Sequence, residues 1–168
     1  SGFEEYLSQR RGYFTNGLKY GKHYTFPGKM FQKHWYDVEN PWIQHVQSMD
    51  AVPWFSKTDE MDLDFLLDAY NSEEMFLSYR SVIEEVVELI QPKFIQLNGK
   101  KPRIIFEELY GIDEFQPMKT IGKGCHSGGL NIGGKIIPVV AHNFSGTFSG
   151  LNGEKEWDTM YDEWTGSS

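Results

Sequence analysis

The most regular hydrophobic pattern in the chain lies between residues 73 and 90. Apolar side chains recur there at steps of three and four, with glutamates outside the stripe that they form: Phe76, Tyr79, Ile83, Val86, Val87 and Ile90. This period predicts an amphipathic helix with one face turned to the core. Another helix is predicted before it, with Thr58 or Asp59 as its N-cap. Its wide apolar face comprises Met61, Leu63, Leu66, Leu67 and Tyr70.

The middle of the chain has shorter apolar runs separated by glycine and proline. Residues 94–97 are predicted as a strand, and Pro102 suits the first turn of a helix that Gly111 closes. Residues 116–135, rich in Gly and Lys, predict a loop or hairpin, and the apolar run 135–141 predicts a strand in the sheet interior. Helix, strand, glycine turn and helix in this order are typical of a parallel α/β sheet.

The two ends of the chain differ in regularity. Residues 1–34 have no clean period and predict an irregular segment packed on the body, although two short helices are predicted within 30–47. Residues 51–55 predict the end of a buried strand. A final helix is predicted from the spacing of Trp157, Met160, Tyr161 and Trp164. We therefore expect an irregular N-terminal segment over 1–34 and a single α/β domain over 35–168.

Composition narrows the class of protein. A chain of 168 residues, 39% of them hydrophobic, has the size and apolar content of one domain. A single cysteine, Cys125, excludes an internal disulfide and a thiolate-rich zinc cluster, so we expect an intracellular compartment, cytoplasmic or, in a eukaryote, nuclear. No run approaches the roughly 20 apolar residues of a membrane-spanning helix, and the start lacks the order of a signal peptide. We expect neither a membrane partner nor a cofactor.

The net charge and the spacing of the histidines argue against long-range phosphate binding and against a metal site. The net charge of −8 argues against long-range attraction to phosphate, which leaves only local groups of Lys and Arg. His23, His34 and His45 lack the spacing of paired metal ligands, so they are expected at the surface or partly buried, and no metal site is predicted. Cys125 beside His126 admits a reactive thiol or a metal ligand, but without further spaced ligands a plain loop is the favoured interpretation.

Candidate chemistry gathers where predicted strands end. Ligands of open α/β sheets bind outside the carboxyl ends of the strands, and residues 53–56, 97–100 and 141–146 occupy such places. The last segment delivers His142 directly at the end of an apolar strand, beside small hydrogen-bonding residues. An imidazole there can donate to a developing anion or a phosphate. The alternative is a histidine whose nitrogens only satisfy loop carbonyls.

Residues 92–100 and 134–145 carry a resemblance to a known superfamily. They read PKFIQLNGK and GKIIPVVAHNFS, with a short helix and a Gly-rich stretch between them. In order and spacing they are similar to the later half of uracil-DNA glycosylase-like domains, where a Pro-Lys-apolar-Gly-Lys strand and turn precedes a Gly-Ile-Pro-Val strand ending in His-Pro-Ser. The resemblance covers about residues 73–150. It implies a three-layer sandwich, with a central, mostly parallel sheet flanked by helices.

The resemblance also implies roles for individual residues at the second segment. His142 would stabilise the base anion as the glycosidic bond breaks. Ser145 and Gly146 would pinch the DNA backbone while the target base is flipped out. Asn143 and Phe144 stand where the superfamily has Pro and Ser, which is a departure from its pattern.

Other parts of the site depart further from the superfamily. Asp50 stands where an Asn reads the uracil edge, and an ionised Asp accepts hydrogen bonds but cannot donate one, so the base recognised is left open. A Gly-x-Asp/Asn-Pro turn that positions the attacking water has no convincing match. Either it lies upstream of a Ser1-Gly2 start typical of a cleaved tag, or the chain is a divergent member. The expected catalytic residues are His142 and Asp50, and the expected substrate- or DNA-binding residues are Asn143, Phe144, Ser145, Gly146, Trp54, Asn98 and Lys100.

Three functions are compatible with these features. The first is a DNA glycosylase-like hydrolase that cleaves the N-glycosidic bond of a flipped uracil or modified base in single- or double-stranded DNA. The second is a catalytically inactive protein of the same fold that binds nucleic acid, a nucleotide or a protein partner, which the altered motifs and the acidic charge favour. The third is an unrelated small-molecule α/β enzyme.

Overall fold

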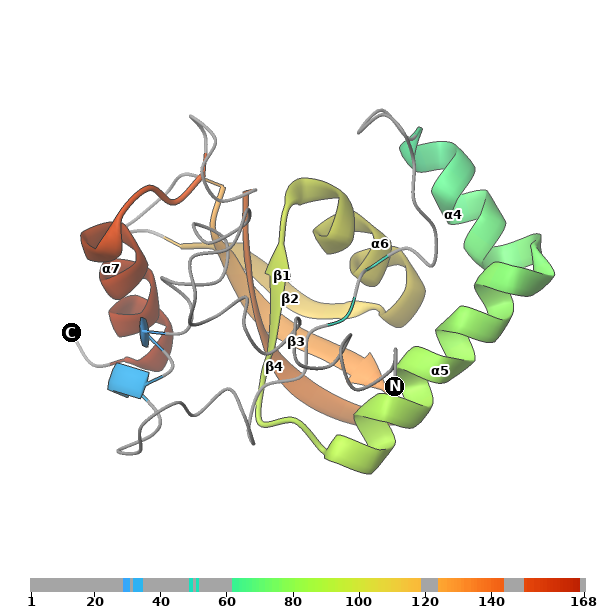
Figure 1. Ribbon diagram of the computed structural model, residues 1–168, viewed down its shortest axis with the longest axis horizontal. Helices are drawn as coiled ribbons and strands as arrows, with labels where there is room; N and C mark the ends of the chain where they lie inside the picture. Colours follow the sequence, from blue (N-terminus) through green and yellow to red (C-terminus); the bar gives the residue numbers. More distant parts are fainter. Residues whose placement is uncertain are drawn as a thin grey trace, which may run out of the picture. The chain divides into compact units, whose positions relative to one another are not determined.

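The computed structural model describes residues 29–30, 32–34, 49, 51, 62–118, 124–143 and 150–166 (Figure 1). The described residues divide into two units. The sheet unit consists of those within 50–117 and 124–143, and the α7 unit of those within 1–49, 118–123 and 144–168.

Helix α4 (Leu63–Ser72) begins later than either predicted cap. Its N-cap is Asp62, whose carboxylate accepts a hydrogen bond from the backbone N–H of Asp64 at 3.0 Å. Asp62 also has the extended backbone that an N-cap requires. The sequence offers several capping residues in close succession, so Thr58 and Asp59 were wrong choices that local pattern alone could not separate from Asp62. Farther along α4, the buried Tyr70 hydroxyl donates to the carbonyl of Ala51.

Helix α5 (Glu74–Ile90) confirms the strongest periodic pattern in the sequence. Phe76 and Ile83 are buried along it, whereas Ile90, at its last turn, is 47% exposed. The helix ends at Gln91, which adopts the left-handed conformation with φ 49° and donates its N–H to the carbonyl of Val87. Such a residue stops the helix while satisfying one of its last carbonyls.

A four-stranded sheet follows, in the order β1-β4-β3-β2. Its strands are β1 (Ile95–Asn98), β2 (Ile112–Pro117), β3 (His126–Ile132) and β4 (Lys135–His142). Helix α6 (Lys100–Tyr110) leaves β1 and packs on the sheet, with Pro102 in its first turn and Gly111 as its C-cap, as predicted. Helix α4 packs on both α5 and α6. The mixed α/β class is thus confirmed for the described residues.

The superfamily resemblance implied a mostly parallel sheet. This expectation is wrong for the described strands. Among the described strands, only β1 and β4 pair in parallel; β3 pairs antiparallel with both β4 and β2. The reason is a tight hairpin: Gly133 and Gly134 join β3 to β4 with φ values of 60° and 78°. Two consecutive residues of positive φ form the turn that suits the twist of adjacent antiparallel strands. The hairpin predicted within 116–135 is therefore present, whereas β2 was not expected.

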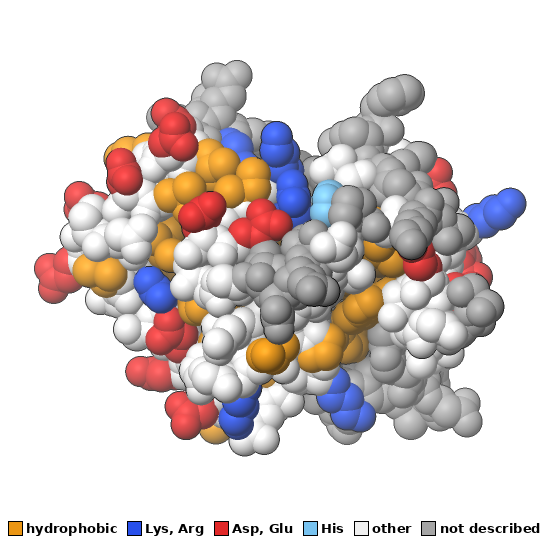
Figure 2. Space-filling model, turned by 180° about the vertical axis from the view of Figure 1, so that it is seen from behind, with side chains coloured by type: hydrophobic (Ala, Val, Ile, Leu, Met, Phe, Trp, Pro, Cys, Tyr) orange, Lys and Arg blue, Asp and Glu red, His pale blue; other side chains and the backbone are white. Residues whose placement is uncertain are grey.

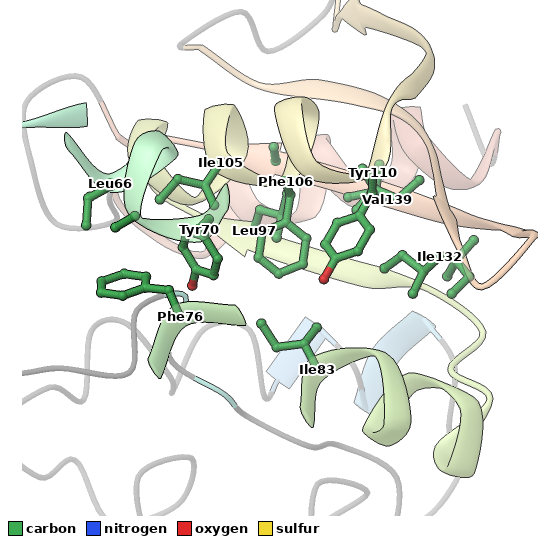
Figure 3. Close-up of a cluster of buried hydrophobic side chains, with 14 residues drawn as sticks. Leu66, Tyr70, Phe76, Ile83, Leu97, Ile105, Phe106, Tyr110, Ile132 and Val139 are labelled. Carbon is green, nitrogen blue, oxygen red and sulfur yellow. The ribbon is translucent and has the colours of Figure 1, made fainter. Parts of the chain in front are cut away.

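The core of the sheet unit lies on one face of the sheet. Leu97, Val139 and Ala141 point to this face together with alternate residues of β3, and side chains of α4, α5 and α6 meet them there (Figure 3). Phe76 packs its ring edge-on against that of Tyr70, with 5.0 Å between the centroids. Burial raises the pKa of Tyr110 to about 12, because the ionised hydroxyl would lose its solvation in the core.

Helix α7 (Glu154–Thr165) gives the α7 unit its apolar centre. Trp157, Met160 and Tyr161 are fully buried at helical spacing, as predicted. Residues 29, 30 and 32–34 are helical, in the region where the sequence predicted the first of two short helices, and Met30 is buried. Among the described helices of both units, none combines the length and apolar content needed to cross a membrane.

Candidate functional site

The parallel pairing of β1 and β4 brings two predicted strand ends together. Asn98 and His142, the last residues of their strands, are partners in the register. The backbone N–H of Gly99 donates to the carbonyl of His142 at 2.8 Å, and α6 begins at the next residue, Lys100. Asn98, Lys100, His142 and the following Asn143 therefore lie at one end of the sheet, as the strand-end argument predicted.

Alternation along the strands places the polar side chains on one face. Successive strand residues point to opposite sides of a sheet, and paired residues point to the same side. Leu97 and Ala141 face the core, so Asn98 and His142 point to the opposite face, together with Gln96. His142 is only 2% exposed, which makes it a buried ionisable group at the strand ends.

The hydrogen bonds of His142 determine which ring nitrogen carries the proton. Its Nδ1 lies 2.9 Å from the carbonyl oxygen of Asn143, and a carbonyl can only accept, so Nδ1 must be the donor. Its Nε2 lies 2.9 Å from the side-chain nitrogen of Gln96. In the neutral ring this Nε2 has no proton and accepts from the Gln96 amide.

Gln96 can serve a protonated His142 equally well. Protonation places a second N–H on the ring, at Nε2, and a half-turn of the Gln96 amide would present its oxygen to that N–H. Because Nδ1 is held by the Asn143 carbonyl, His142 can donate from Nε2 only as the imidazolium. Gln96 is therefore a hydrogen-bond partner of His142 that the sequence prediction missed. The available signal was a polar residue two positions before Asn98 in an otherwise apolar strand.

Asn143 is held close to a glycine in the turn before β3. Gly124 has φ 67°, and a Cβ built there would overlap the side-chain amide of Asn143. This approach and the left-handed backbone both require glycine at the position. The same turn orients His126, whose Nδ1 lies 3.0 Å from the Gly124 carbonyl, but His126 pairs with Ala141 and so points to the core face of the sheet.

Replacing Gly124 with alanine is expected to lower the free energy of unfolding by about 1.5–3.5 kcal/mol. A left-handed alanine costs roughly 1–2 kcal/mol, and displacing Asn143 from its rotamer adds about 0.5–1.5 kcal/mol. Gly133→Ala is the matched control, because Gly133 has φ 60° but a Cβ there would meet nothing within 4 Å. Urea denaturation of both variants measures the difference. Equal losses would show that Asn143 does not depend on the space above Gly124.

The remaining predicted site residues lie outside the described residues. These are Asp50, Trp54, Phe144, Ser145 and Gly146. Comparison of the chain with protein-family models, with curated proteins and with solved structures finds no match in any of the three. The strand ends are therefore the part of the described chain whose chemistry bears on function.

Proposed function

We propose that this chain is a DNA glycosylase-like hydrolase that cleaves the N-glycosidic bond of a flipped uracil or modified base. The observation that carries the proposal is the pairing of Asn98 with His142 at the carboxyl ends of two adjacent parallel strands, where α6 begins. Ligand sites of α/β proteins form at such places. The three-layer arrangement of uracil-DNA glycosylase-like domains belongs to this proposal.

The residues at the strand ends suit recognition of a base and stabilisation of its anion. The Asn98 amide can both donate to and accept from the edge of a base. When the bond between the sugar carbon and the base nitrogen breaks, the electron pair goes to the base. Water adds to the sugar carbon and gives up a proton, and the base anion takes up a proton. An imidazolium at His142 would donate from Nε2 to the departing anion. For this, the Gln96 amide would have to turn away from Nε2 or be displaced by the base.

The start of α6 is suited to a phosphate of the DNA backbone. Lys100 is exposed at its first position, and its first turn contains no acidic residue. The dipole of a helix favours an anion at such an end. On the face shown in Figure 2, acidic side chains of the described residues lie at several separate places, with Lys and Arg singly or in small groups among them. Binding is thus expected to depend on few phosphate contacts and to weaken only modestly with salt.

The second candidate is an inactive protein of the same fold that binds a base, nucleotide or nucleic-acid end. Its support is the hydrogen bonding of His142, since both ring nitrogens already pair within the protein. A histidine so engaged can order the strand ends without taking part in chemistry. The net charge of −8 also suits a small ligand better than a long duplex.

An excision assay tests the proposal directly. The full chain is incubated with single- and double-stranded oligonucleotides that contain uracil or one of a panel of modified bases, and abasic sites are detected by alkaline cleavage. We expect excision of at least one modified base and none from matched unmodified oligonucleotides. Binding of an oligonucleotide without excision would support the second candidate, and neither binding nor excision would reject both.

A further inference from the structure

Helix α7 presents a row of carboxylates to the helical residues 29, 30 and 32–34. Glu154, Asp158 and Asp162 recur every four residues, so they lie on one face of the helix. Lys29 pairs with Glu154 at 3.2 Å. Farther along both segments, Asp158 and Asp162 face a histidine.

This histidine is His34, whose side chain is 9% exposed. Its Nε2 lies 3.1 Å from the Oδ1 of Asp158 and 3.8 Å from the Oδ1 of Asp162. The ring also packs against that of Tyr161, with 5.7 Å between the centroids. The imidazole is thus held in place with one nitrogen directed at two carboxylates.

Two of the separations among these three atoms are close to those in a metal coordination sphere. In a tetrahedral zinc site with bonds of about 2.0–2.1 Å, neighbouring ligand atoms are about 3.3–3.4 Å apart. The separations of 3.1 and 3.8 Å lie on either side of that value, and all three ligand atoms fall within 4.8 Å of one another. We propose that His34, Asp158 and Asp162 form a binding site for a divalent transition-metal ion of the zinc class. This proposal does not depend on the proposed base excision.

The ligand types select the class of ion. Imidazole nitrogen is a preferred ligand of zinc and its neighbours in the transition series, and carboxylates complete many such sites. Mg²⁺ and Ca²⁺ prefer oxygen ligands throughout, so a site with one imidazole disfavours them. Three protein ligands leave a tetrahedral position for water.

Lys33 would compete with the metal ion for the carboxylate of Asp158. Its Nζ lies 2.5 and 2.6 Å from the two carboxylate oxygens of Asp158. A divalent ion bound to Asp158 would have to displace the ammonium group. Loss of the Lys33 charge should therefore strengthen metal binding, which a merely structural ion pair would not predict.

Zinc titration of the full chain by calorimetry, in a buffer that does not chelate metals, tests the site. We expect saturable binding of Zn²⁺, with Mg²⁺ at least about tenfold weaker. His34→Ala should weaken Zn²⁺ binding at least about tenfold, and Lys33→Ala should strengthen it about fivefold by removing a nearby charge. Co²⁺ bound in place of Zn²⁺ should give the visible absorption of a tetrahedral site, and His34→Ala should lose it.

Matched variants distinguish zinc binding at this site from zinc binding elsewhere and from general effects of a lost charge. Lys29→Ala removes the same charge from the neighbouring ion pair with Glu154 and should leave zinc affinity nearly unchanged. His126→Ala removes a histidine of the sheet unit and should also have no effect. Circular dichroism establishes that each variant is folded. Absence of zinc binding by the unaltered chain, binding that survives His34→Ala, or equal effects of Lys33→Ala and Lys29→Ala would each overturn the proposal.

Discussion

His142→Asn is expected to lower the rate of base excision by a factor on the order of 10² to 10⁴. The Asn side-chain amide can occupy the place of Nδ1 and still donate to the carbonyl of Asn143, but nothing replaces Nε2. The variant therefore removes the group that would face the departing base and keeps the hydrogen bond that orders the strand end. The measurement is the single-turnover rate on the base that the intact protein excises, with thermal unfolding recorded in parallel.

His126→Asn is the control for this variant. His126 also directs its Nδ1 to a carbonyl, that of Gly124 at 3.0 Å, but it points to the opposite face of the sheet. Its excision rate should remain within about twofold of the unaltered protein. Equal loss in both variants would assign the effect to disturbed strand ends, and an unchanged rate in His142→Asn would remove His142 from the proposed chemistry.

Replacing Phe76 with alanine is expected to lower the free energy of unfolding by about 3–5 kcal/mol. Phe76 is 1% exposed, and its ring packs edge-on against that of Tyr70, so the substitution removes buried apolar surface and leaves a cavity where α4 and α5 meet. A loss of this size is a large part of the total stability of about 5–15 kcal/mol that is usual for a domain. Urea denaturation followed by tryptophan fluorescence and circular dichroism measures it.

Phe65→Ala provides the same chemical change at an exposed position. Phe65 lies on α4 and is 53% exposed, so its loss should change the free energy of unfolding by about 0.5 kcal/mol or less. A loss at Phe65 as large as that at Phe76 would contradict the assignment of the buried face of these helices.

The helices that follow a long periodic pattern could be predicted from the sequence. In α5, the repeat of apolar side chains over more than four turns is compatible with only one period, and a helix buries that stripe at almost any site where it docks. Trp157, Met160 and Tyr161 in α7 are a shorter case of the same kind. The start of α4 was less certain, because several residues near it could serve as caps and only the folded backbone selects Asp62.

The sheet shows where local pattern is insufficient. An apolar run such as 135–141 predicts a buried strand, but its alternation is the same in a parallel and an antiparallel pair. The direction of pairing depends on the connections, here a two-glycine turn between β3 and β4 and a helical crossover after β1. The sequence suggested a hairpin within 116–135 without indicating which strands it would join.

In the candidate sites too, some features follow from local sequence and others depend on the tertiary structure. The sequence by itself determined that His142 and Asn98 stand at strand ends, because the end of an apolar run is a local property. Only the tertiary structure decided that Asn98 and His142 are neighbours, that Gln96 holds the imidazole, and that His34 meets Asp158 and Asp162 from more than 100 residues away in the chain. Such contacts depend on strand register and helix docking, which are set by the packing of the whole core and leave no periodic signal at the residues themselves.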